Sequence, residues 1–193
     1  MEQKIINIYL ESNPNPNSLK FVTEQELSPE PIDYASVHTA SECPLAMDLF
    51  RFSFVKRVFI TANFITITKS EDMDWTEISP MIKSLIKGYL EEGKPLFRVI
   101  PAVVARGLEA GEDNELVAKI KSILDEYIKP AVEQDGGAIT FKSFDQGVVT
   151  VELQGSCSGC PSSTITLKSG IENLLKRMMP EVTEVVAESG IPA

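Results

Sequence analysis

The feature that most constrains the fold is the stretch RVIPAVVARGLEAGEDN at residues 98–114, which divides the chain into two parts. Its residues follow neither the period of two of a strand nor the 3.6-residue period of a helix. It contains one proline, two glycines and an acidic cluster near its end, a composition typical of a connection between folded units. We therefore expect a linker at 98–113 that joins an N-terminal domain at 1–97 to a C-terminal domain at 114–193.

The N-terminal part mixes strand and helix patterns. Strands are expected at 4–10, 19–23, 32–39 and on either side of Ala62-Asn63, and helices at 41–52 and 72–93. Asp74 and Glu77 resemble a capping box at the start of the second helix. Pro80 instead favours a later start, near Ser79, because proline disrupts a helix interior.

The C-terminal part begins with a helix expected at 114–137, in which Leu116, Ile120, Ile123 and Tyr127 share one apolar face. A hairpin at 137–155 that turns at 145–147, a helix at 161–180 and a strand at 181–189 follow. The order in this part is therefore α-β-β-α-β. Together the two parts predict the α+β class, with two small domains that each mix helices and strands.

Charge and hydropathy exclude several partners. The formal net charge of −10 and the isoelectric point of about 4.7 argue against a nucleic-acid backbone and against an anionic membrane surface. No apolar run reaches the ~18–20 residues of a membrane span, and the N-terminus lacks the pattern of a signal or transit peptide. Three cysteines, an odd number, argue against a disulfide framework, so we expect a reducing compartment, the cytoplasm.

Two of the three cysteines, Cys157 and Cys160, form a C-x-x-C pair between the last hairpin strand and the next helix. Unpaired N–H groups and the dipole at a helix N-terminus favour thiolates, the form of cysteine that binds metal. Gly155 and Gly159 would let the backbone approach a bulky ligand closely. An iron–sulfur cluster or a structural zinc takes four ligands, and one chain offers two here. A metal site would thus need a second chain related by a two-fold axis.

Three interpretations of the pair stay open on spacing and context alone. A metal site shared by two chains is one, either for a cluster or for a zinc ion in a structural dimer. A redox dithiol of a thiol–disulfide oxidoreductase is another, although thioredoxin-like proteins place the motif early in a βαβ unit. A pair of inert, buried small residues is the third.

The segments VEQDGGAITF and VELQGSCSGCPSSTITLKSGIENLLKRMMPEV closely resemble the C-terminal domain of NifU, which also occurs in Nfu-type iron–sulfur proteins. This resemblance covers roughly 115–188. The segments NPNPNSLKF, CPLAMDLF, VKRVFITANFITITK and DMDW resemble the N-terminal domain of Nfu proteins. The two resemblances together cover most of the chain.

The resemblance implies a carrier of a labile iron–sulfur cluster rather than an enzyme. It implies a [4Fe–4S] cluster, or alternatively [2Fe–2S], held between two subunits by Cys157 and Cys160 of each chain. The implied partners are an upstream scaffold or donor, apo iron–sulfur client proteins that receive the cluster, and a second copy in the cluster-bound homodimer. Cys43 stands where the family usually has serine, so it is not expected to be a ligand. His38, in an expected strand, is interpreted as a structural or surface imidazole.

Near the start of the hairpin, Asp135, Gly136 and Gly137 are expected to end a helix and begin a strand. Glycine at such a helix end adopts positive φ, so we assign these residues a backbone role. Trp75 follows a helix cap and is interpreted as a core residue.

Overall fold

The computed structural model of the chain describes residues 5–98, 115–158 and 161–189. The chain forms two compact units, Met1–Ala105 and Arg106–Ala193, and each is described by itself. The expected linker at 98–113 lies, except for Arg98, outside the described residues.

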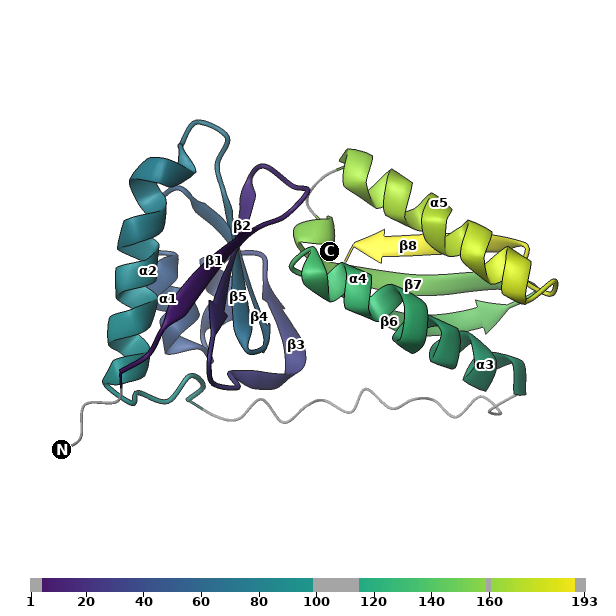
Figure 1. Cartoon of the computed structure of the whole chain (residues 1–193), viewed down its shortest axis with the longest axis horizontal. Coiled ribbons are helices and arrows are strands. Elements are labelled where there is room, and N and C mark those ends of the chain that lie inside the picture. Colours follow the sequence, from purple (N-terminus) through teal and green to yellow (C-terminus); the bar gives the residue numbers. More distant parts are fainter. Residues whose placement is uncertain (1–4, 99–114, 159–160, 190–193) are drawn as a thin grey trace. The chain divides into compact units, whose positions relative to one another are not determined.

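The first unit contains a five-stranded antiparallel sheet. Its strands, in the order in which they lie side by side, are β1 (Ile8–Ser12), β2 (Ser18–Thr23), β5 (Phe64–Lys69), β4 (Val55–Ala62) and β3 (Ser28–Tyr34). Two helices, α1 (Pro44–Leu49) and α2 (Trp75–Glu91), lie on one side of this sheet (Figure 1).

Strand alternation and the helix stripe explain the core of this unit. Every second side chain of the central strands faces the helices, including Val58 and Ile60 on β4 and Ile65 on β5, and these are fully buried. Helix α2 contributes Ile78 and Ile82 to the same core, in register with a 3.6-residue period. Removing each such side chain from water stabilises the fold by about 2 kcal/mol.

Helix α2 begins at Trp75, earlier than the start near Ser79 that Pro80 suggested. The carboxylate of Asp74 caps it by accepting a hydrogen bond of 2.7 Å from the Thr76 N–H. Pro80 lies in the second turn, where its ring removes only one backbone donor from a helix of 17 residues. The N-cap and the buried stripe therefore outweigh the local cost of the proline.

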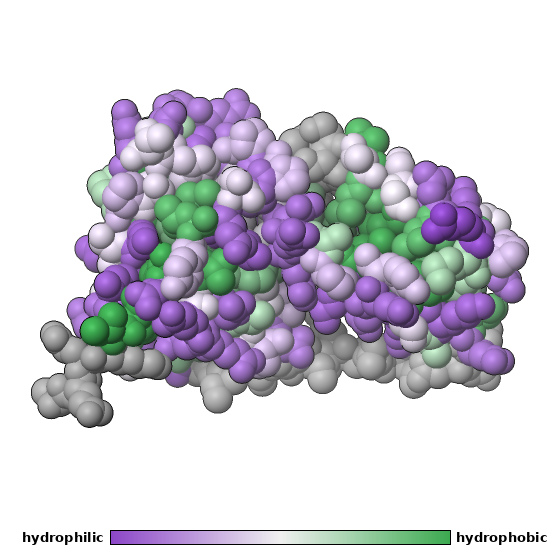
Figure 2. Space-filling view, viewed as in Figure 1, coloured by the Kyte–Doolittle hydropathy of each residue, from purple (hydrophilic) through white to green (hydrophobic). Residues whose placement is uncertain are grey.

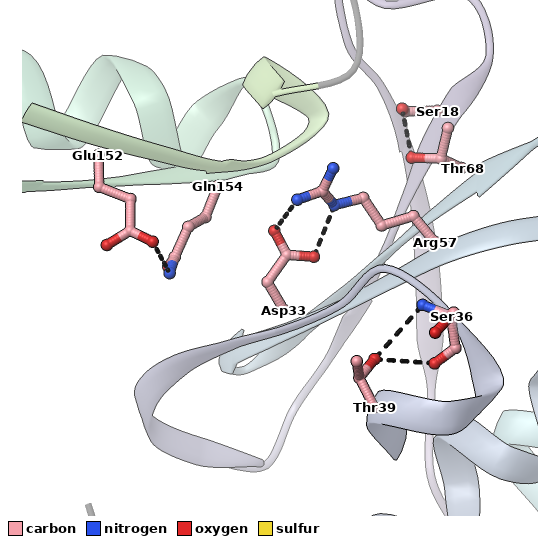
Figure 3. Close-up of polar contacts among 8 residues, drawn as sticks. All are labelled: Ser18, Asp33, Ser36, Thr39, Arg57, Thr68, Glu152 and Gln154. Atoms are coloured by element: carbon pink, nitrogen blue, oxygen red, sulfur yellow. Dashed lines mark hydrogen bonds and ion pairs between the residues drawn. The ribbon is translucent and has the colours of Figure 1, made fainter. Parts of the chain in front are cut away.

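The third strand differs from the expectation, because it ends at Tyr34 and His38 lies in a 3₁₀ turn, η1 (Val37–Ala40). Ser36 and Thr39 explain the turn. The Ser36 N–H donates to the Thr39 hydroxyl at 3.3 Å, and that hydroxyl donates to the Ser36 carbonyl at 2.8 Å (Figure 3). These side-chain bonds compete with pairing to a neighbouring strand.

The second unit has the predicted order α-β-β-α-β and, with the first unit, confirms the α+β class. Its elements are α3 (Glu115–Ile123), the π-helical turn η2 (Leu124–Ile128), α4 (Lys129–Gln134), β6 (Gly137–Asp145), β7 (Val148–Gly155), the 3₁₀ turn η3 (Ser156–Ser158), α5 (Pro161–Met178) and β8 (Glu184–Ser189). The sheet order is β6-β7-β8, antiparallel between β6 and β7 and parallel between β7 and β8 (Figure 1).

A single regular helix was expected at the start of this unit, but a π-helical turn lies between α3 and α4. Pro130 has no N–H and its ring crowds the carbonyl four residues earlier, so the helix widens before it. The Lys129 N–H accordingly donates to the carbonyl of Leu124, five residues back. The wider turn shifts the helix face, and Tyr127, expected on the apolar face, is 50% exposed.

The hairpin of the second unit turns where the sequence predicts it. Asp145 pairs with Val148, which leaves Gln146 and Gly147 as a two-residue loop with φ of 47° and 87°. Positive φ at both positions matches the right-handed twist of the flanking strands. The register set by this turn shifts by one residue at a bulge between Phe141 and Ser143, and the ladder then ends with Gly137 opposite Gly155.

Figure 2 shows a mostly hydrophilic surface with hydrophobic patches on each unit. Within the part of the chain that the structure describes, no helix is long and apolar enough to cross a membrane.

Candidate metal centre

Cys157 lies in the turn η3, between the end of β7 at Gly155 and the start of α5 at Pro161. Gly155 has a φ of +70°, and this left-handed conformation turns the chain out of the strand. Cys160 and its neighbour Gly159 are outside the described residues.

The Cys157 side chain points into the second unit and is only 5% exposed. It belongs to the core cluster that includes Ile139, Leu153, Ile171 and Leu175. In this environment the buried thiol packs as a small apolar group.

Gly137 makes room for this thiol. A Cβ atom at Gly137 would lie 2.8 Å from the Cys157 Sγ and 2.6 Å from the carbonyl oxygen of Gln154, both too close for real atoms. The sulfur thus rests directly against the backbone at the start of β6. Sequence reasoning missed this contact, because it gave both neighbouring glycines a purely conformational role. That role is confirmed at Gly136, with a φ of +77°.

Ser156 ties the cysteine turn to the junction of α4 and β6. Its N–H donates to the Gly136 carbonyl at 3.3 Å, and its hydroxyl donates to the Asp135 carbonyl. The hydroxyl oxygen also lies 3.9 Å from the Cys157 Sγ. These contacts join two segments that are about twenty residues apart in sequence.

Burial raises the pKa of the Cys157 thiol above its ordinary value, while the Ser156 hydroxyl lowers it and the nearby Asp135 carboxylate raises it. Desolvation is the largest of these effects. The expectation of a thiolate stabilised at a helix N-terminus is therefore wrong for Cys157 in the ligand-free chain. In that state the residue is a neutral thiol at neutral pH, and a metal would have to displace its proton.

Cys43 lies in the first unit and is fully buried as the N-cap of α1. Its Sγ accepts a hydrogen bond of 3.4 Å from the Ala46 N–H. Burial raises the pKa of this thiol as well, against smaller opposing effects of hydrogen bonds from Ala46 and Tyr34. Cys43 therefore has a structural role as the buried N-cap of α1.

The other candidates also have structural roles. Trp75 packs against the first core, lies edge-on to Phe21 with ring centroids 6.5 Å apart, and donates from its indole nitrogen to the Pro16 carbonyl at 3.0 Å.

Among the described residues, no group of three or more His, Cys, Asp and Glu side chains could hold a metal ion.

The fold and the site define the class as a two-domain α+β protein with a cysteine pair at a strand-to-helix junction of its second domain. Residues 8–93 match the family model "Scaffold protein Nfu/NifU N terminal", and residues 120–186 match "NifU-like domain". The chain belongs to the Nfu/NifU-like family, which confirms the resemblance noted in its sequence.

Named relatives cover nearly the whole chain. It is 43% identical to the Homo sapiens protein named NFU1 iron-sulfur cluster scaffold homolog, mitochondrial, over 180 residues. The matched region covers 92% of this chain and 70% of that protein. It is 39% identical over 191 residues to NifU-like protein 4, mitochondrial, of Arabidopsis thaliana, spanning 97% of this chain and 68% of that protein. A solution structure of a NifU-like protein from Saccharomyces cerevisiae is 25% identical, covers 51% of this chain and 89% of that one, and has a TM-score of 0.46.

Proposed function

We propose that the chain is an iron–sulfur cluster scaffold and carrier, not an enzyme. The observation that carries this proposal is its similarity, over most of both lengths, to a protein named as an iron–sulfur cluster scaffold. The cluster is the cargo of such a protein and leaves intact. The chain therefore needs ligands that hold it and release it, rather than groups that transform it.

We propose Cys157 and Cys160 as the ligands, with a [4Fe–4S] cluster, or alternatively [2Fe–2S], shared between two copies of the chain. Clusters of both kinds take four thiolates, and each chain has this one pair. Cys43 does not fit the role, because it is fully buried in the other unit and caps a helix there. The ligand count thus supports a homodimer in the loaded state.

Transfer proceeds by ligand exchange, in which thiolates of an apo client protein replace those of Cys157 and Cys160. Each replacement breaks one iron–sulfur bond to the carrier and forms one to the client. The client thiol gives up its proton, and the released cysteine takes one up. No electron moves in this exchange. The raised pKa of Cys157 favours release, because its thiol is the stable form once the metal has gone.

The proposed partners are an upstream cluster donor and apo iron–sulfur clients, with the first unit as the recognition module. Nucleic acid and anionic membranes are disfavoured by the net charge of −10. We propose the cytoplasm as the compartment, although the two relatives compared above are mitochondrial by name. Fractionation of the source cells, with an antibody against this chain, would decide between the two compartments.

Anaerobic reconstitution with iron and sulfide tests the function. We expect a brown dimer with about four iron atoms per two chains, lost in Cys157→Ser and in Cys160→Ser. Cys43→Ser is the matched control and should keep the cluster. A cluster retained by the Cys157/Cys160 double variant would refute the ligands.

Two other outcomes of this experiment would replace the function itself. A colourless protein that reduces insulin disulfides would indicate an oxidoreductase. A colourless dimer with one zinc would indicate a structural site.

A further inference from the structure

The buried position of Cys157 is at odds with the exposure that a shared ligand needs. A cysteine that binds a cluster together with a second chain must present its sulfur at the surface, yet this side chain is only 5% exposed. Its sulfur instead lies against the backbone of Gly137. Cys157 must therefore move outward before it can bind a cluster with a partner.

Ser156 provides the contacts that oppose this movement. This residue is 3% exposed and immediately precedes the cysteine. Its N–H donates to the Gly136 carbonyl at 3.3 Å and its hydroxyl donates to the Asp135 carbonyl, so two bonds hold the turn η3 against the junction of α4 and β6. Any outward swing of the turn pulls on both bonds.

We propose that Ser156 is a positioning residue that latches Cys157 in its buried position, and that the latch opens when a cluster is loaded. The purpose of the latch rests on the function proposed above, but its existence does not. Opening moves the Ser156 hydroxyl from the Asp135 carbonyl to water and brings the Cys157 sulfur out of the core. No covalent bond changes in this step.

The hydroxyl is the part of the latch that a substitution can remove cleanly. Ser156→Ala keeps the backbone N–H and its bond to the Gly136 carbonyl, and it places a smaller side chain in the same space. Loss of one hydrogen bond of ordinary strength raises the population of the open form about fivefold. An alkylating reagent that reaches the thiol only in the open form reports this population directly.

The test is alkylation of the ligand-free full chain by iodoacetamide at fixed pH, in a Cys160→Ser background. Cys157 is then the one thiol of the second unit. Mass spectrometry of the peptides gives its rate, with the fully buried Cys43 as an internal reference. We expect Ser156→Ala to speed the alkylation of Cys157 about fivefold and to leave the rate at Cys43 unchanged.

One control variant separates the latch from a general loss of stability. Ile171→Val trims a fully buried side chain of the same core, so it lowers global stability and keeps both hydrogen-bonding groups of Ser156. If this control speeds the reaction as much as Ser156→Ala does, or if Ser156→Ala has no effect, the latch is overturned.

Iron content distinguishes the failure of the latch from the failure of the proposed function. Ser156→Ala with Cys160 intact should load faster than the unchanged chain and reach the same final iron content. If neither chain takes up iron, the cluster function fails while the alkylation result still decides the latch.

Discussion

Gly137 is the position near Cys157 where the packing leaves no room for a side chain. A Cβ atom there would meet the Cys157 Sγ at 2.8 Å and the Gln154 carbonyl oxygen at 2.6 Å. The carbonyl belongs to the paired strand β7 and cannot move freely, so Gly137→Ala must displace the cysteine or open the hairpin. We expect a loss of about 1–3 kcal/mol in the free energy of unfolding, measured with urea.

Gly170 in α5 offers the matched control for this change. Nothing lies within 4 Å of a Cβ atom built there, and the residue is in a helix. Gly170→Ala should therefore stabilise the second unit by about 0.5–1 kcal/mol. If the two substitutions had the same sign, the close packing of Cys157 on Gly137 would be wrong.

Cys43 shows how a thiol can be explained without any metal. Its sulfur accepts the Ala46 N–H at the start of α1 and is fully buried. Serine is a preferred N-cap, so Cys43→Ser should keep the cap and change the free energy of unfolding by less than about 1 kcal/mol. Cys43→Ala removes the acceptor and should cost more. Thermal unfolding followed by circular dichroism distinguishes the two, and a large loss in Cys43→Ser would contradict the assignment.

At the scale of elements, the free edge of β8 is protected by a side chain of α5. The Glu172 carboxylate accepts hydrogen bonds from the Lys176 ammonium at 2.6 Å and from the Val185 N–H at 3.2 Å. These bonds lower the pKa of Glu172, the one with Lys176 most strongly. Because β8 is the last strand of the sheet β6-β7-β8 in the described part of the chain, the carboxylate satisfies a donor on its outer edge.

The lowered pKa of Glu172 predicts how the second unit responds to acid. A carboxyl group that is easier to ionise in the folded state stabilises the fold above its ordinary pKa and loses that contribution as pH falls through the lowered value. Glu172→Gln should therefore reduce the stability near pH 7 and flatten its decline towards acid pH. Urea midpoints at several pH values check this. If the urea midpoint of Glu172→Gln changed with pH in parallel with that of the unchanged chain, the Glu172 hydrogen bonds would not contribute to stability as argued.

Most elements could be predicted from the sequence, because their signals are local. The turn at Gln146-Gly147, the strand alternation and the order of elements in the second unit all depend on neighbouring residues. The errors arose where a local signal met a competing one. Tyr127 left the apolar face because Pro130 widens the helix, and His38 left its strand because Ser36 and Thr39 bond to each other.

The main feature of the site that the sequence did not reveal is the buried position of the Cys157 side chain. The spacing of the two cysteines and the neighbouring glycines identify the loop, but they cannot say that the thiol turns inwards. That orientation depends on Gly137 and Ser156, which come together only when β6 and β7 pair. A contact between residues about twenty positions apart leaves no mark in a single sequence.

At the scale of the whole molecule, each of the two units has its own hydrophobic core. The first core is built mainly from residues of the sheet, α1 and α2, and it includes Cys43. The second consists of β6, β7, β8 and the helices around them, and it includes Cys157. Each unit thus has its own source of stability, and the proposed ligands belong to the second unit alone.

The proposed half-site in each chain makes loading depend on both concentration and pH. Two chains of 21.3 kDa must meet to complete four ligands, so the loaded species should have twice that mass and dissociate on dilution as iron is lost. Burial raises the pKa of Cys157, so binding must displace its proton. Below that pKa, the apparent affinity should rise about tenfold per pH unit for each proton displaced. Analytical ultracentrifugation and iron titration between pH 6.5 and about 8.5 measure both effects. A loaded monomer, or an affinity independent of pH, would show that the ligands are not the paired thiols of two chains.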